Sequence, residues 1–442
     1  MLVVTLDVLG PRMAGPAIRA WHVAEALSSE HDVVLATVKP LGLPPGRLDL
    51  RHVDESELRL LVQWCETVIF QGFVLQQFPW LGDTDKILIV DAYAPLHLEQ
   101  LEQSGGLGRD AHRHVVASGV AALDQQLARA DFVLCASERQ RDLWLGHLGA
   151  LGRVNPDTYA QDPSLRRLID VVPFGLPDRP PVRLAPAIRG VVPGIGDQDK
   201  VLLWGGGVYN WFDPLTLLHA MARLADAHPE IKLFFLGLVH PNPDVEEMDM
   251  AREARRLSAE LGLTGRSVFF NETWVPYERR GDYLLDADVG VSTHRDHVET
   301  RFAFRTRVLD YLWASLPVVL TEGDALADLT ERRESGRTVP PGDADALARA
   351  VLAVLQESEA SLCRARAADL AQEYRWSLVL EPLTRFVATA SRAADSGRPH
   401  VARRAGRSFA GLRRDVAVGR ARLRTGGLRA VLPGVRRRLG AL

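Results

Sequence analysis

The densest group of residues that could carry chemistry lies between positions 294 and 322. It combines arginines, acids and histidines in one loop and at the start of one expected helix, residues 306–314: Arg301, Arg305, Arg307, Asp310, Glu299, His294 and His297. Arg307 and Asp310 stand three positions apart and so share a helix face. A guanidinium suits a diphosphate, and a carboxylate suits a ribose diol. A solvated, salt-bridged helix start is the alternative, but the apolar residues of this helix predict burial, and buried charges need partners.

Two loops that contain glycine follow expected strands. Gly15 precedes a helix expected over residues 18–27, and Gly205-Gly206-Gly207 comes directly after a strand expected over residues 201–204. Glycine lets the backbone approach an anion, and a following helix N-terminus supplies amide donors and a favourable dipole. Neither loop has the spacing of a dinucleotide-binding or Walker A motif. Tight turns are the alternative, although three consecutive glycines are more than a turn needs.

Polar residues follow another strand, which we expect over residues 87–90. Asp91 comes directly after this strand, and His97 lies six positions further along the chain. Ligands of a parallel sheet bind beyond the C-terminal ends of its strands, so we predict that both side chains face the ligand. A histidine in such a place is at least as often a hydrogen-bonded structural residue, and for His97 both interpretations stay open.

Short apolar runs that alternate with helical patterns must position these candidates. We expect strands over residues 2–6, 33–36, 67–70, 87–90, 132–136 and 169–172, and then over residues 201–204, 232–236, 268–270, 289–292 and 318–320. This alternation predicts parallel sheets with crossover helices. The fold class is therefore α/β, with two Rossmann-like, doubly wound domains that face a central cleft.

The same pattern divides the chain into five parts. We predict a first Rossmann-like domain over residues 1–175, a linker rich in proline and glycine over 176–198 and a second Rossmann-like domain over 199–375. A closing helix over 376–396 is expected to return to the first domain, and residues 397–442 form a basic tail.

Length and composition exclude several classes of protein. The 442 residues suffice for two cores, and 47% hydrophobic with 25% charged residues is typical of a globular protein. The three cysteines are far apart, which argues against a zinc site or a disulfide framework and indicates a reducing compartment such as the cytoplasm. No run approaches the roughly 18 apolar residues that span a bilayer. Asp286 and Asp288 formally fit a metal-binding pair, but they are more typical of helix-end residues.

The net charge of −3 hides a division along the chain. Residues 397–442 contain 13 arginines and one acid, whereas the rest of the chain carries a net charge of −15. Apolar residues between the arginines suit a peripheral contact with the anionic inner face of a membrane. A disordered basic extension and docking on the acidic body are the alternatives. Nucleic acid is not expected as a partner, because no aromatic platform accompanies the arginines.

The order of several motifs resembles the retaining family 4 type of GT-B glycosyltransferase, the glycosyl transferases group 1. The helix with Arg307 and Asp310 leads into Pro317-Val318-Val319, where many members of the family have a helix that begins Lys-x-x-Glu-Tyr. Further landmarks follow in the expected order: Ser137-Glu138, Val172-Pro173-Phe174-Gly175, Leu236-Gly237-Leu238, Val275-Pro276-Tyr277 and Tyr374-Arg375-Trp376-Ser377. The resemblance covers roughly residues 1–390.

This resemblance implies a transferase that needs no metal or other cofactor. It would move a sugar, with retention at the anomeric carbon, from a nucleotide-diphosphate sugar to a glycan, lipid-linked or small-molecule acceptor. The donor would lie on the second domain and the acceptor on the first. The predicted donor-binding residues are Gly15, Gly206, Gly207, Arg305, Arg307 and Asp310. The predicted catalytic residues are Asp91, His97 and Glu299.

Two departures from the family pattern keep other functions open. Many members carry two glutamates eight positions apart, and with Asp310 as the second, the first falls on Phe302, so that Glu299 is the nearest substitute. Many also have an arginine and a lysine after the glycine loop, where residues 208–214 contain no base. A sugar-nucleotide epimerase of the same fold and a noncatalytic nucleotide-sugar-binding protein are the alternatives.

Overall fold

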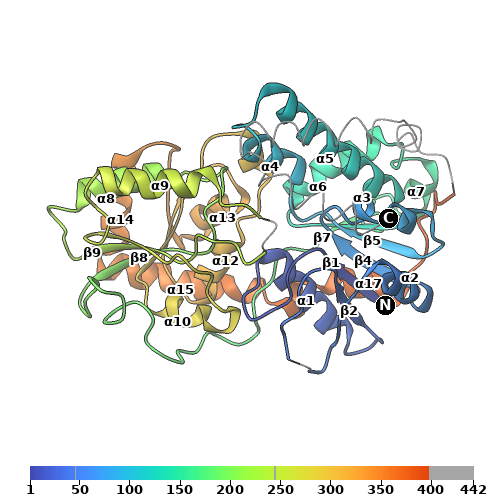
Figure 1. Ribbon diagram of the computed structural model, residues 1–442, viewed down its shortest axis with the longest axis horizontal. Coiled ribbons are helices and arrows are strands. Elements are labelled where there is room, and N and C mark those ends of the chain that lie inside the picture. The colour runs from blue at the N-terminus through green and yellow to red at the C-terminus, as the bar shows by residue number, and fades with distance from the viewer. Residues whose placement is uncertain (45, 243–244, 398–442) are drawn as a thin grey trace, which may run out of the picture.

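A computed structural model describes residues 1–44, 46–242 and 245–397. Figure 1 shows two lobes side by side, each with a sheet between helices. The first lobe, drawn in blue to cyan, comes from the first part of the chain, and the second, in green to orange, comes from the later part. Within the described residues, no helix is both long and apolar enough to cross a membrane. The predicted basic tail, apart from Gly397, lies outside the described residues.

The first lobe contains seven parallel strands in the order β3-β2-β1-β4-β5-β6-β7. The strands are β1 Leu2–Thr5, β2 Val34–Thr37, β3 Asp49–His52, β4 Thr67–Gln71, β5 Ile87–Asp91, β6 Phe132–Cys135 and β7 Ile169–Val171. The helices are α1 Gly15–Leu27, α2 Glu55–Trp64, α3 Val74–Gln77, α4 Leu96–Gln103, α5 Arg109–Arg129, α6 Glu138–Ala150 and α7 Pro156–Gln161, with a 3₁₀ turn at Pro79–Asp83.

The second lobe contains six parallel strands in the order β10-β9-β8-β11-β12-β13. The strands are β8 Lys200–Trp204, β9 Ile231–Phe235, β10 Val268–Phe270, β11 Val289–Ser292, β12 Val318–Thr321 and β13 Gly336–Val339. The helices are α8 Pro214–Leu224, α9 Asp249–Glu260, α10 Arg280–Leu285, α11 Val298–Phe302, α12 Thr306–Trp313, α13 Ala325–Arg333, α14 Ala344–Val354 and α15 Glu357–Glu373, with a 3₁₀ turn at Tyr277–Arg279.

The predicted fold class, α/β with two doubly wound halves, is confirmed by these sheets. Two edge strands, β3 and β13, were not predicted. β3 has the sequence Asp-Leu-Arg-His and is largely exposed, and β13 begins with Gly336 and Arg337. An edge strand pairs on one side only and needs less apolar surface, so it leaves no apolar run in the sequence.

The segment that connects the lobes contains no helix or strand, and it is held on α10. The Asp282 carboxylate accepts hydrogen bonds from the backbone of Leu184 and Ala185 at 2.6 and 3.2 Å. The Asp286 carboxylate accepts two more, both at 2.9 Å, from Ala187 and Ile188. Carboxylates thus fix this irregular segment, and for the buried residues Ala187 and Ile188 they satisfy backbone N–H groups that water does not reach. These hydrogen bonds give Asp286 a structural role in holding the connecting segment.

The chain crosses between the lobes a second time after α15. The closing helix predicted over residues 376–396 is instead two short helices, α16 Trp376–Val379 and α17 Glu381–Ala388. The break falls where Pro382 stands in the first turn of α17, a position that proline favours because it cannot continue a preceding helix. In Figure 1 this orange to red segment runs from the second lobe to the first. There Phe386 stacks on Phe132, with ring centroids 4.2 Å apart.

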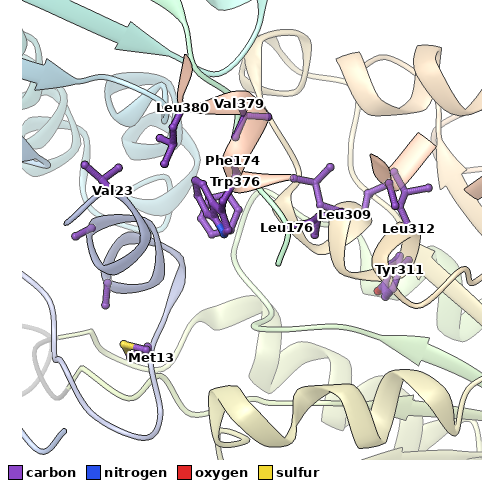
Figure 2. Packing of buried hydrophobic residues seen from close by; sticks show 14 of the residues in the cluster. Met13, Val23, Phe174, Leu176, Leu309, Tyr311, Leu312, Trp376, Val379 and Leu380 are labelled. Carbon is purple, nitrogen blue, oxygen red and sulfur yellow. The ribbon is translucent and has the colours of Figure 1, made fainter. Parts of the chain in front are cut away.

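The two crossings pack against each other. Leu176 donates its backbone N–H to Tyr374 at 2.6 Å, and Trp376 donates to Leu176 at 2.9 Å. Figure 2 shows Phe174 and Trp376 in contact at this place, with Leu176 between them and α12. A Cβ atom at position 175 would overlap the indole of Trp376, so glycine is required for the two crossings to approach each other.

Candidate functional site

A cavity of about 530 Å³ lies between the two sheets and is the candidate site, which we call the central cavity. The first lobe lines it with the C-terminal ends of β1, β4 and β5, through residues 5–7, 71–73 and 90–94. The second lobe adds residues 205–207 after β8 and 236–237 after β9. Strand order reverses between β1 and β4 and between β8 and β11, so the cavity lies at the switch point of both sheets.

Hydrogen bonds join the two lobes near the central cavity. Tyr277 donates its backbone N–H to the Pro11 carbonyl at 2.8 Å. The Gln140 side chain donates to the carbonyl of Phe302 at 2.8 Å. Phe302 does not line the central cavity but a separate surface pocket beside Arg301. The residue that departs from the family pattern therefore contacts the first lobe through its backbone.

The glycine loop after β8, residues 205–207, contacts the buried side chain of Arg307. Gly206 has a φ of +77°, in the left-handed region that favours glycine. The carbonyl of Gly207 accepts a hydrogen bond from Arg307 Nη2 at 2.6 Å. Gly206 and Gly207, both predicted to bind the donor, line the central cavity together with Arg307.

The Arg307 guanidinium is buried without a carboxylate partner among the described residues. Its side chain lies over the rings of Trp204 and Phe212, with the guanidinium carbon 4.6 and 4.0 Å from the two centroids. Only 8% of the residue is exposed, and Nη1 has no hydrogen-bond partner. Burial lowers the pKa of Arg307 to about 10, which still leaves it charged at neutral pH. A buried cation that lacks a counter-ion favours binding of an anion from solution.

Asp310 lies three residues further along α12 and also lines the central cavity. Its carboxylate accepts a hydrogen bond from Arg280 Nε at 3.2 Å, and 39% of its side chain is exposed. Removal of water within the cavity raises the pKa of Asp310. Arg280 is fixed by stacking on Tyr277 and Trp313, at 3.8 and 4.4 Å. The carboxylate is therefore oriented but keeps room to accept further hydrogen bonds.

Glu299 and Arg305 line the central cavity as a buried ion pair. Arg305 donates from Nη1 and Nη2 to the two carboxylate oxygens of Glu299, at 2.8 and 2.6 Å. Asp324 lies 3.8 Å from Arg305 Nε and 3.4 Å from His294 Nε2. Each charge is thus largely neutralised within the protein, and the geometry suits positioning of the helix start better than proton transfer by Glu299.

Asp91 reaches the central cavity, but its carboxylate is bound on both oxygens. Arg19, which is fully buried in α1, donates to it from Nε and Nη2 at 2.6 and 2.9 Å. The same guanidinium donates to the carbonyls of Val172 and Pro173, at 2.9 and 2.8 Å. This network ties β5, α1 and the first crossing together. The catalytic role predicted for Asp91 stays a prediction, and the geometry favours a structural role.

His97 and Gly15, the remaining predicted residues, are placed differently. His97 does not line the central cavity; its ring packs on Trp144, with centroids 5.6 Å apart. Burial, together with the nearby His147, lowers the pKa of His97 to about 4, so it is neutral at physiological pH. Gly15 is the first residue of α1 and lines the central cavity, where a helix N-terminus favours an anion.

Sequence reasoning did not select several polar residues that line the central cavity, among them Asp7, Gln71 and Glu99. Asp7 and Gln71 each stand at the end of a strand that the sequence predicts, so the rule that selected Asp91 could have found them. Glu99 lies on α4, two positions after His97, and nothing in the local pattern distinguishes it.

Two parallel, doubly wound sheets that share one ligand cavity define the GT-B class of fold. Sucrose-phosphate synthase from Thermosynechococcus elongatus has this fold, with a TM-score of 0.62 and 16% identity over 88% of this chain and 99% of that chain. HepE of Anabaena in complex with UDP-glucose matches with a TM-score of 0.63 and 13% identity, again over 88% of this chain and 99% of that chain.

The family is evident in the second lobe. Residues 199–357, less than half of the chain, match the family model of the glycosyl transferases group 1. A phosphatidyl-myo-inositol mannosyltransferase of Mycolicibacterium smegmatis is 24% identical over 179 residues, which are 40% of this chain and 42% of that protein. The match thus spans less than half of the length of that relative. The fold that the motifs predicted is confirmed, and the predicted family is the one whose model matches residues 199–357.

Proposed function

We propose that the protein is a glycosyltransferase that moves a sugar from a nucleotide-diphosphate sugar to a glycan, lipid-linked or small-molecule acceptor, with retention at the anomeric carbon. The group 1 family of the second lobe and the UDP-glucose held by the HepE neighbour support a nucleotide-sugar donor. The single observation that carries the proposal is the unpaired guanidinium of Arg307 beside Gly206 and Gly207 in the central cavity.

In this proposal the donor diphosphate lies between the glycine loop and the start of α12. Arg307 Nη1 and the backbone amides of the loop donate hydrogen bonds to the phosphate oxygens, and Asp310 accepts from the ribose hydroxyls. The bond between the anomeric carbon and the diphosphate breaks while an acceptor hydroxyl bonds to the same face of that carbon. The hydroxyl proton passes to the leaving diphosphate. The cation stabilises the charge that develops on the leaving group.

A thermal-shift screen of UDP-, GDP-, dTDP- and ADP-sugars tests the donor class, because a ligand that binds only the native state raises the melting temperature. We expect one nucleotide to raise it clearly above the others. Transfer is then assayed with that donor over a panel of acceptors. If no nucleotide sugar raises the melting temperature at saturating concentration, the proposed function is wrong.

Arg307→Ala and Asp310→Ala test the assigned contacts. Loss of a charge-assisted hydrogen bond should weaken nucleotide binding about tenfold to a hundredfold, without unfolding of the chain. Isothermal titration calorimetry measures the affinity. Arg301→Ala is the matched control, since Arg301 is an exposed arginine of the same segment that does not line the central cavity. Unchanged affinity in both variants would remove the donor-site assignment.

A noncatalytic nucleotide-sugar-binding protein is the second candidate. The observations that favour it are Phe302 in place of an acid and the engagement of Glu299 and Asp91 by arginines. Under this alternative the protein binds a nucleotide sugar but neither transfers nor hydrolyses it with any acceptor of the panel. Detection of a glycosylated product excludes it.

We also propose a cytoplasmic location with a peripheral contact of the basic tail at the inner face of the membrane. The three free, buried cysteines and the arginine content of residues 397–442 support this proposal. Each base near an anionic surface contributes about 1 kcal/mol. Truncation after Ser396 should preserve the fold and reduce sedimentation with vesicles that contain phosphatidylserine. Equal sedimentation of the full chain and the truncated chain would contradict the membrane contact.

A further inference from the structure

The wall that the first lobe contributes to the central cavity carries polar atoms that have no hydrogen-bond partner in the described part of the chain. Gln71, the last residue of β4, is 5% exposed and donates its amide N–H to the Pro16 carbonyl, while its Oε1 atom has no hydrogen-bond partner. Asp7 is 7% exposed, and its Oδ1 accepts the backbone N–H of Val8 at 3.0 Å. Among the described residues, no contact engages the second oxygen of Asp7.

Glu99 belongs to the same wall. It lies on α4, which packs against α11 of the second lobe, and within the described chain no hydrogen bond engages its carboxyl group. Burial raises the pKa of Glu99 to about 8, and Glu299 across the cavity raises it while Arg305 opposes the rise. When Glu99 is ionised, its charge contributes to raising the pKa of Tyr93 and of Tyr209. At neutral pH the carboxyl group retains its proton and can both donate and accept a hydrogen bond.

Charge is distributed unevenly around the central cavity. All its basic side chains come from the second lobe: Arg280, Arg305, Arg307 and His240. The described cavity-lining residues of the first lobe include no Lys, Arg or His. Arg19 lies behind this wall, fully buried and paired with Asp91. The donor side of the cavity therefore suits an anion, and the opposite wall does not.

We propose that Asp7, Gln71 and Glu99 form an acceptor subsite that binds the hydroxyl groups of a neutral sugar or polyol and discriminates against phosphorylated acceptors. This inference rests on the proposed glycosyltransferase function. Carbonyl, carboxylate and carboxyl groups that need partners hydrogen-bond to hydroxyls, as buried polar groups of a binding site do. A phosphate would instead lie beside Asp7 without a compensating cation, and juxtaposed like charges disfavour such a complex.

Matched acceptor pairs test the inference. The protein is first saturated with the tightest-binding nucleotide diphosphate among UDP, GDP, dTDP and ADP. Binding of glucose is then compared with that of glucose 6-phosphate, and binding of myo-inositol with that of inositol 1-phosphate, by saturation-transfer NMR titration. We expect the neutral member of a pair to bind about tenfold tighter or more. Equal or tighter binding of the phosphorylated member would overturn the inference.

Substitutions separate the subsite from the donor site. The double variant Asp7→Asn/Glu99→Gln keeps the shape of both side chains but removes the charge of Asp7 and the ionisable proton of Glu99. The ratio of neutral to phosphorylated binding should therefore fall severalfold. Glu102→Gln on the same helix is the control, because Glu102 does not line the central cavity. An unchanged ratio in the double variant refutes the subsite. Failure of all four nucleotides to bind refutes the proposed function instead, and nucleotide affinity should be the same in every variant.

Discussion

The ion pair between Arg19 and Asp91 permits a decisive experiment on a residue predicted to be catalytic. Asp91→Asn keeps the size of the side chain and removes its charge. Arg19 is fully buried and directs two donors at the carboxylate, at 2.6 and 2.9 Å. After the substitution, the guanidinium stays buried, and its acceptors are all uncharged: the carbonyls of Val172 and Pro173 and the side-chain amide oxygen at position 91. The variant therefore contains a buried cation without a counter-ion.

The expected loss of stability is large. Removal of one partner of a buried ion pair costs about 3–5 kcal/mol, which is a substantial part of the roughly 5–15 kcal/mol that stabilise a native protein. A lobe of this size loses about 2–4 °C of melting temperature per kcal/mol, so we expect Tm to fall by about 6–20 °C. Urea denaturation followed by tryptophan fluorescence measures the change in the free energy of unfolding.

A double variant provides the control. Arg19→Met/Asp91→Leu removes both charges and replaces them with apolar side chains of similar volume, so most of the lost stability should return. The reasoning is refuted if Asp91→Asn unfolds within about 0.5 kcal/mol of the unsubstituted protein while transfer activity is abolished. Asp91 would then be a catalytic residue, as the sequence predicts, and the ion pair would contribute little to stability.

Two further predictions concern the pH dependence of stability and the contact between the two crossings. The pKa of Glu99 is about 8 in the folded protein, against an ordinary value of 4.5. Between these pH values the folded state keeps a proton that the unfolded state loses. The free energy of unfolding should therefore fall as pH rises through this range, by at most about 1.4 kcal/mol per pH unit. Glu99→Gln should flatten this dependence in melting curves recorded from pH 5 to pH 9, and parallel curves for the two proteins would contradict the buried-carboxyl argument. Gly175→Ala should destabilise the protein by about 1–3 kcal/mol, because the added Cβ overlaps Trp376. Gly149→Ala on α6, where an added Cβ would meet no atom within 4 Å, should be neutral or stabilising in the same urea titration. Equal stabilities of the two variants would contradict the requirement for glycine at position 175.

Much of the architecture follows from local patterns along the chain. Buried strands such as β5 and β8 are short apolar runs, and their periodicity differs from that of the helices that follow. The edge strands β3 and β13 were missed because a strand that pairs on one side needs no apolar run. The predicted closing helix is two helices, and Pro382 in the first turn of the second one is a local signal of this break that was present in the sequence.

The location of the candidate site can be predicted from the sequence, but the ion pairs that its charged residues form cannot. The glycine loop and the helix with Arg307 and Asp310 were selected from the sequence, and both line one cavity. The sequence does not reveal that Glu299 binds Arg305 or that Asp91 binds Arg19, although these contacts decide which charges remain free for a ligand.

The sequence by itself determined the α/β alternation, the two-lobed fold, the family motifs of the second lobe and the strand ends that line the central cavity. Each of these depends on side-chain types at short spacing. Only the tertiary structure decided that Arg307 lacks a counter-ion among the described residues, that His97 lies outside the central cavity and that Asp7 and Glu99 line it. These properties depend on contacts between residues distant in the chain and on the removal of water around them. Burial and pairing, not residue type, determine the charge that a side chain presents to a ligand.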